Sequence, residues 1–144
     1  MAAISKMTGL FYLISLLLFP LYSYAGPKED YELQERCGKR SDERFRTEYG
    51  NGISADKDWN TMFGYINHYN KKLNKCFILI TGTSYPTDKK GNVIRMKNLY
   101  DINENKEYAS FVTVKEKITD CRVSDKNCKS EYKWDELVKP YMEE

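Results

Sequence analysis

The sequence has little of what the common classes of hydrolase and metalloenzyme need. It contains one histidine, His68, so an H-E-x-x-H zinc motif cannot form. It has no G-x-S-x-G segment that would present a nucleophilic serine, and no cysteine pair has the C-x2-C spacing of a zinc site. Asp120, Asp125 and Glu131 lie close together in the chain, but the glycine-containing pattern of a calcium loop is absent. We therefore expect no metal site and no cofactor.

An excess of charge of one sign is also absent. The chain has 23 basic and 21 acidic residues, a formal net charge of +2, and both signs are interspersed along it. Proteins that bind nucleic acids or anionic membranes usually concentrate positive charge, so we expect neither as a partner. The sequence has no internal repeat and no low-complexity linker. Residues 26–144 are therefore expected to form one domain.

The first 25 residues have the pattern of a secretory signal peptide. Lys6 is their only charged residue, an apolar run from Gly9 to Phe19 follows it, and the small residues Ser23 and Ala25 have the spacing that signal peptidases recognise. The run is shorter than the roughly 20 residues of a membrane-spanning helix. We expect cleavage near Ala25–Gly26, a periplasmic or secreted mature chain, and no membrane anchor after cleavage.

All four cysteines lie in the expected mature chain. An even number of cysteines in an oxidising compartment favours disulfide bonds. Four cysteines allow three pairings, of which we expect Cys37–Cys76 and Cys121–Cys128. Cys37 belongs to the apolar stripe of an expected helix, and Cys76 opens the most apolar strand. The pair 121–128 would close a polar loop that has little apolar content of its own.

The periodicity of apolar residues predicts an α+β fold in the order helix, four strands, helix. Residues 30–49 place apolar side chains on one stripe, and the glycines of 50–52 are expected to end this helix. Residues 119–130 are expected to form a loop, and Ser130 to begin the last helix. The expected antiparallel meander has four strands with short connections, at 59–69, 76–85, 93–102 and 107–116. Both helices are expected to cover one apolar face of that sheet.

Two segments resemble a group of small exported bacterial proteins that are labelled hypothetical. They are NHYNKKLNKCFILITGTSY at 67–85 and WDELVKPYMEE at 134–144. The similarity extends over most of the expected mature chain. It implies a location in the bacterial envelope or outside the cell, and it implies no mechanism.

Two functions remain open. A non-enzymatic module that binds another protein, of inhibitor or immunity type, is favoured by the small size, the disulfides and the many tyrosines, which are common at interfaces; tyrosines also serve to fill a sheet core. The alternative is a small secreted hydrolase or nuclease-like enzyme that uses His68, Arg95 and Glu116. Proton transfer would need these groups within about 3 Å of a substrate, and no motif ensures that geometry. We expect His68 to be a structural residue near the end of its strand.

Overall fold

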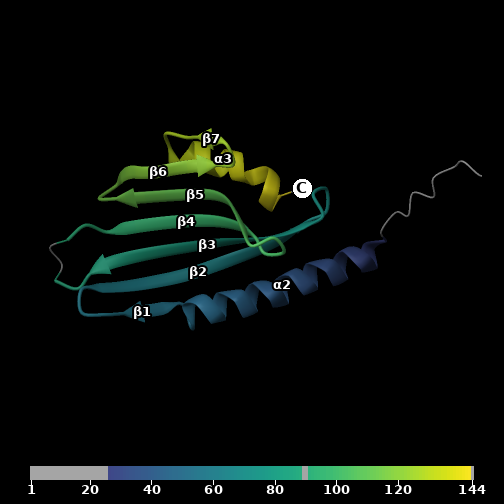
Figure 1. Ribbon diagram of the computed structural model, residues 1–144, viewed down its shortest axis with the longest axis horizontal. Coiled ribbons are helices and arrows are strands. Elements are labelled where there is room, and N and C mark those ends of the chain that lie inside the picture. Colours follow the sequence, from purple (N-terminus) through teal and green to yellow (C-terminus); the bar gives the residue numbers. More distant parts are fainter. Residues whose placement is uncertain (1–25, 89–90, 144) are drawn as a thin grey trace, which may run out of the picture.

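The computed structural model describes residues 26–88 and 91–143, which form an antiparallel sheet and two helices (Figure 1). The strands follow one another across the sheet in chain order, from β1 to β7. The elements are α2 (Pro27–Tyr49), β1 (Ile53–Ala55), β2 (Trp59–Asn70), β3 (Lys75–Pro86), β4 (Ile94–Asp101), β5 (Lys106–Val114), β6 (Lys117–Val123), β7 (Lys126–Asn127) and α3 (Glu131–Met142). The expected signal peptide lies outside the described residues.

The expected α+β fold with a four-stranded meander is wrong, because the sheet has seven strands and the fold is mostly sheet. Strands β2 to β5 lie close to the expected positions, whereas β1, β6 and β7 were not expected. Strand β1 has only three residues, all of them exposed, which is too short a segment for alternation to indicate a strand. Strand β6 buries Cys121 and Val123, but its first three residues are exposed, and the segment therefore resembled a loop.

The end of α2 depends on two glycines, as expected. Gly50 has a positive φ of 60°, and its N–H donates to the carbonyl of Arg46 at 2.9 Å. Gly52 also has a positive φ, and a Cβ atom there would lie 2.7 Å from the carbonyl oxygen of Phe63. That carbonyl belongs to β2, so only glycine lets the chain leave the helix this close to the sheet.

The two helices cover opposite faces of the sheet, and the expectation that both cover one face is also wrong. Phe77 of β3 packs in a core with Trp134 of α3, whereas its neighbour Ile78 packs in a second core with Phe45 of α2. Successive side chains of a strand point to opposite faces. We call these faces the α3 face and the α2 face. In Figure 1, α2 lies beside β1 and β2, and α3 lies beside β5 and β6.

The two cores differ in size. On the α2 face, the buried residues Phe45, Ile78 and Ile80 pack against several aromatic rings. The core on the α3 face is larger and consists of Phe77, Leu99, Ala109, Phe111, Cys121, Val123, Trp134 and Val138. The indole N–H of Trp134, which is fully buried, donates to the carbonyl of Ser110 at 3.0 Å. This bond satisfies a polar group inside the larger core.

Two disulfides are present, and their pairs are those expected from the sequence. Cys37–Cys76 joins α2 to the beginning of β3, with the two Cα atoms 5.4 Å apart. Cys121–Cys128 joins β6 to the segment that leads into α3, with the Cα atoms 5.1 Å apart. The N–H of Cys128 also donates to the carbonyl of Cys121 at 2.9 Å. One disulfide therefore joins α2 itself to the sheet, and the other joins the sheet to the segment just before α3.

Candidate interaction surface

The α3 face of the sheet is only partly covered. Helix α3 packs over β3 to β6 and contacts the end of β2 at Asn70. Within residues 26–88 and 91–143, no helix lies over the rest of the α3 face of β1 and β2. Ile53, Met62 and Ile66 are there 65%, 54% and 59% exposed. Ile53 pairs with Met62 across β1 and β2, and Ile66 pairs with Leu79 across β2 and β3, so all four side chains point to one side. We call the surface of Ile53, Met62, Ile66 and Leu79 the open face.

The four residues of the open face include no Lys, Arg, Asp or Glu, although 31% of the residues of the chain are charged. The only charged residue that the register of β1, β2 and β3 places on this side is Lys75, at the end of β3 that lies farthest from Ile53. The fourteen residues on this side are Ile53, Ala55, Asn60, Met62, Gly64, Ile66, His68, Asn70, Lys75, Phe77, Leu79, Thr81, Thr83 and Tyr85. A solvent-exposed surface normally mixes charges of both signs. A contiguous exposed apolar patch instead marks a site of interaction.

A hollow runs between the open face and α3. Its volume is about 370 Å³, and Leu79, Val138 and Met142 contribute apolar side chains to it. The same hollow is lined by three carboxylates and one ammonium group, those of Asp135, Glu136, Glu143 and Lys139. The apolar floor therefore has a net acidic wall on its α3 side.

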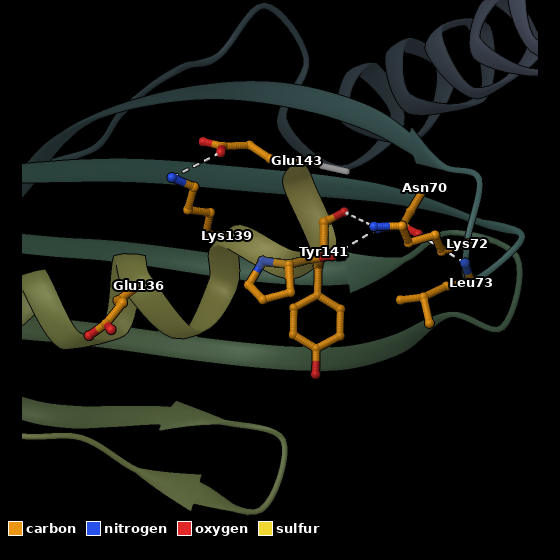
Figure 2. A pocket seen from close by; sticks show the side chains of 8 residues that line it. Asn70, Lys72, Leu73, Glu136, Lys139, Tyr141 and Glu143 are labelled. Carbon is orange, nitrogen blue, oxygen red and sulfur yellow. Dashed lines mark hydrogen bonds and ion pairs between the residues drawn. The ribbon is translucent and has the colours of Figure 1, made fainter.

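A second, larger hollow of about 620 Å³ lies between the turn that joins β2 to β3 and the C-terminal half of α3 (Figure 2). Leu73, which is 45% exposed, lies in Figure 2 beside the ring of Tyr141. Glu136, Lys139 and Glu143 line both hollows, so the two are neighbours along α3. Together they extend the open face along the helix.

Asn70 holds the C-terminal end of α3 against the sheet. Its side chain is 1% exposed, and its Nδ2 donates to the carbonyls of Pro140 and Tyr141 at 2.9 and 3.3 Å (Figure 2). Its Oδ1 accepts from the N–H of Leu73 at 2.9 Å. The last carbonyls of a helix have no partner within the helix. Asn70 therefore satisfies this end of α3 and at the same time shapes the turn that borders the larger hollow.

Lys97 of β4 holds the N-terminal part of α3. Its Nζ lies 2.6 Å from Glu131 and 2.9 Å from Asp135, and it stands 5.4 Å from the ring of Trp134. Burial disfavours the charged form of Lys97, but the hydrogen bonds to the two carboxylates outweigh it and raise the pKa of this lysine. The position of α3 beside the open face is therefore determined at both ends.

The residues of the alternative hydrolase site do not come together. Arg95 and Glu116 line one hollow of about 430 Å³ at the far end of the sheet. Arg95 is in register with Thr83, and Thr83 with Met62. His68 lies six residues farther along β2 than Met62, which is about 20 Å at the rise of a strand. His68 therefore has no access to a substrate held by the other two residues.

His68 itself is half-buried on the α3 face. Its Nε2 atom is buried, and no hydrogen-bond partner for it is present among the described residues. Asp120, Asp125 and Glu131, the acidic residues of the calcium hypothesis, lie on β6, in the following turn and at the start of α3. Within 26–88 and 91–143, no group of three or more His, Cys, Asp or Glu residues could hold a metal ion.

The tyrosines divide between the two roles that the sequence left open. Tyr49, Tyr65, Tyr100, Tyr108 and Tyr141 pack against the two cores. Tyr31, Tyr85 and Tyr132 are exposed, and Tyr132 lines the hollow beside the open face. More tyrosines therefore pack against the cores than lie exposed on the surface.

Sequence reasoning missed the open face. Residues 59–69 were expected to form a strand, and alternation places Met62, Ile66 and His68 on one side of it. Of these three residues, only His68 was assigned a role. The signal was available, because this parity has apolar residues and no charge. What the pattern lacks is any information on whether a helix covers that side.

Comparisons of the chain with protein-family models, with curated proteins and with solved structures found no match. The interpretation of the open face therefore depends on its own geometry and chemistry.

Proposed function

We propose that this chain is a non-enzymatic binding module, of inhibitor or immunity type, that docks another protein on its open face. One observation supports this proposal above the others. Ile53, Met62 and Ile66 expose more than half of their surface on the part of the α3 face formed by β1 and β2, where no Lys, Arg, Asp or Glu is present. Leaving such residues in water is unfavourable by roughly 25 cal/mol per Å² of apolar area. Covering them by a partner recovers that free energy.

The partner belongs to the same compartment as this chain. Two disulfides fit an oxidising extracellular or periplasmic location. None of the helices in the described part of the chain is both long and apolar enough to cross a membrane. We further propose that residues 1–25 are a signal peptide that is cleaved after Ala25, and that the resemblance to small exported bacterial proteins reflects this location.

Mass spectrometry of the exported protein tests the location. Expression with the native N-terminus is expected to yield a periplasmic or secreted chain that begins at Gly26. Recovery of the chain from membranes with residues 1–25 retained would contradict cleavage.

A matched pair of isoleucine variants tests the binding face. Ile66→Lys places a charge in the open face, whereas Ile118→Lys changes a 38% exposed isoleucine on β6, far from it. Each mature variant is used to capture partners from envelope extract, and the amount of each captured protein is compared with the wild type. We expect a partner whose capture falls at least about tenfold with Ile66→Lys, which corresponds to about 1.4 kcal/mol, and stays unchanged with Ile118→Lys. Equal capture by both variants would overturn the proposal.

A further inference from the structure

The open face is about as wide as one α-helix with its side chains. Neighbouring strands lie about 4.8 Å apart, so β1, β2 and β3 together span about 10 Å across the sheet. A helix with its side chains is about 10–12 Å wide. Helix α3 already occupies the layer above β4 to β6 and above Phe77 of β3, and its flank forms one side wall of the space over β1, β2 and the rest of β3. A helix laid beside α3 would complete this layer and cover Met62 and Ile66.

The side wall determines the charge of such a helix. Asp135, Glu136 and Glu143 face the hollow with Lys139 as the one basic group that lines it. Glu136 and Glu143 are more than half exposed and already pair with lysines of α3, in contacts of 2.9 and 3.3 Å. Such exposed pairs contribute little by themselves, so these carboxylates are available to a second cation. The complementary helix is apolar below and basic on the side next to α3.

Addition of a partner strand to β2 is disfavoured by the position of α2. Gln34 of this helix accepts the N–H of Tyr69 at 2.8 Å through Oε1, and its Nε2 donates to Asn67 Oδ1 at 3.0 Å. In Figure 1, α2 continues along the edge of β2 where β1 ends. The backbone edge that a new strand would need is therefore occupied at this point.

The described helices of this chain do not have the required charge. The sequence of α2 contains six basic and seven acidic residues, and that of α3 contains two basic and three acidic residues. A second copy would therefore bring no basic helix to the acidic wall. A helix from another protein meets the requirement.

We infer that the occupant of the open face is an amphipathic basic α-helix of the partner protein, which lies beside α3 with its apolar stripe on Ile53, Met62, Ile66 and Leu79. The inference rests on the proposed function and specifies its partner. It belongs to the helix-in-groove mode of recognition, in which apolar side chains at helical spacing provide anchors and flanking charges select the partner.

Two synthetic peptides test the inference on the mature chain. Both are about 18 residues long, five helical turns, with the same leucine stripe; one carries lysines on its polar face and the other glutamates. Their dissociation constants are measured by fluorescence anisotropy at low salt. We expect the lysine peptide to bind at least about tenfold more tightly than the glutamate peptide, a difference of about 1.4 kcal/mol. Ile66→Lys is expected to weaken the lysine peptide by a similar factor, and Ile118→Lys to leave it unchanged.

Charge reversal separates this inference from general attraction to a basic peptide. The double variant Glu136→Lys, Glu143→Lys is expected to reverse the preference toward the glutamate peptide. The control Glu32→Lys, Glu43→Lys makes the same change in net charge on exposed positions of α2 and is expected to keep the original preference. Equal effects of the two double variants, or equal binding of both peptides by the wild type, would overturn the inference.

Two further outcomes have a definite meaning. A dimer in sedimentation velocity that Ile66→Lys dissociates would show that a second copy covers the open face, and would overturn the inference. Capture from extract that depends on Ile66 without any preference for the lysine peptide would leave the proposed function intact and overturn the basic helix alone.

Discussion

The half of the molecule around α2 and the half around α3 are stabilised differently. The α2 core has three buried apolar residues, Phe45, Ile78 and Ile80, and a disulfide that joins the helix directly to β3. The α3 core has eight buried residues, and its disulfide closes only a short segment before the helix. The disulfide of the α2 half also closes the longer loop, so by the chain-entropy estimate it contributes more to stability than the disulfide of the α3 half.

The same two halves also differ in what they leave uncovered. On the α2 face, helix α2 covers Phe63, Tyr65, Ile78 and Ile80 of β2 and β3. On the α3 face, β2 exposes Met62 and Ile66 because α3 lies farther along the sheet. Both faces are apolar, so the difference arises from the placement of the helices and not from composition. An apolar sheet face therefore indicates a binding surface only when it is known that no helix of the chain covers it.

The largest expected effect concerns the two disulfides. Cys37→Ala with Cys76→Ala opens a loop with a sequence separation of 39, whereas Cys121→Ala with Cys128→Ala opens one of 7. The chain-entropy estimate gives losses of about 4 and about 2–3 kcal/mol in the free energy of unfolding. Urea titration of both double variants measures them. An equal or larger loss for the 121–128 pair would show that the α2 half does not depend more on its bond.

The next effect compares two asparagines of β2, one in each half. Asn70→Ala removes the donor to two α3 carbonyls and the acceptor for the N–H of Leu73, all at a buried position. We expect a loss of about 1–3 kcal/mol. Asn67→Ala removes one half-buried bond to Gln34, and we expect a loss below about 1 kcal/mol. Thermal unfolding in parallel checks the pair, and a reversed order would contradict the role of Asn70 at the end of α3.

The smallest effect is a loss of stability at alkaline pH. Burial raises the pKa of Tyr49, Tyr65 and Tyr100 on the α2 face above the ordinary value of 10.0. The folded protein therefore favours the neutral phenols. Their contribution is fully present below pH 10 and is lost as the pH rises through the raised values. The pKa of Lys97 beside α3 is also raised above its ordinary value of 10.5, so its contribution to stability is likewise lost at high pH.

Absorbance at 295 nm and urea titration between pH 8 and pH 12 measure this effect together. We expect three tyrosines to titrate later than in the unfolded chain, with a decrease in stability that begins above pH 10. Stability that rises over this range would contradict the burial of these phenols. The variants Tyr49→Phe and Tyr100→Phe assign the absorbance changes at 295 nm to individual tyrosines. Tyr65→Phe is less direct, because it also removes the hydrogen bond to Asp42.

Much of the local structure was predictable from the sequence. The apolar stripe and the glycines at 50 and 52 determined the first helix and its end, and Ser130 accepts the N–H of Lys133 at the start of the last helix, as an N-cap does. The run from Cys76 to Ile80 is apolar on both parities, which indicated a strand covered on both sides. Both disulfide pairs also followed from these local patterns. Strand β1 was not predictable, because its exposed residues are in a strand only through their pairing with β2.

By itself, the sequence determined the elements that carry their own periodicity, the cysteine pairs, and the absence of a motif that would bring His68, Arg95 and Glu116 together. Only the tertiary structure decided that the two helices lie on opposite faces and that three short strands complete the sheet. Alternation along a strand records which side chains share a face, but the partner that covers a face is chosen by contacts between distant segments. The open face exists because α3, anchored by Asn70 and Lys97, packs over β3 to β6 and stops short of Met62 and Ile66.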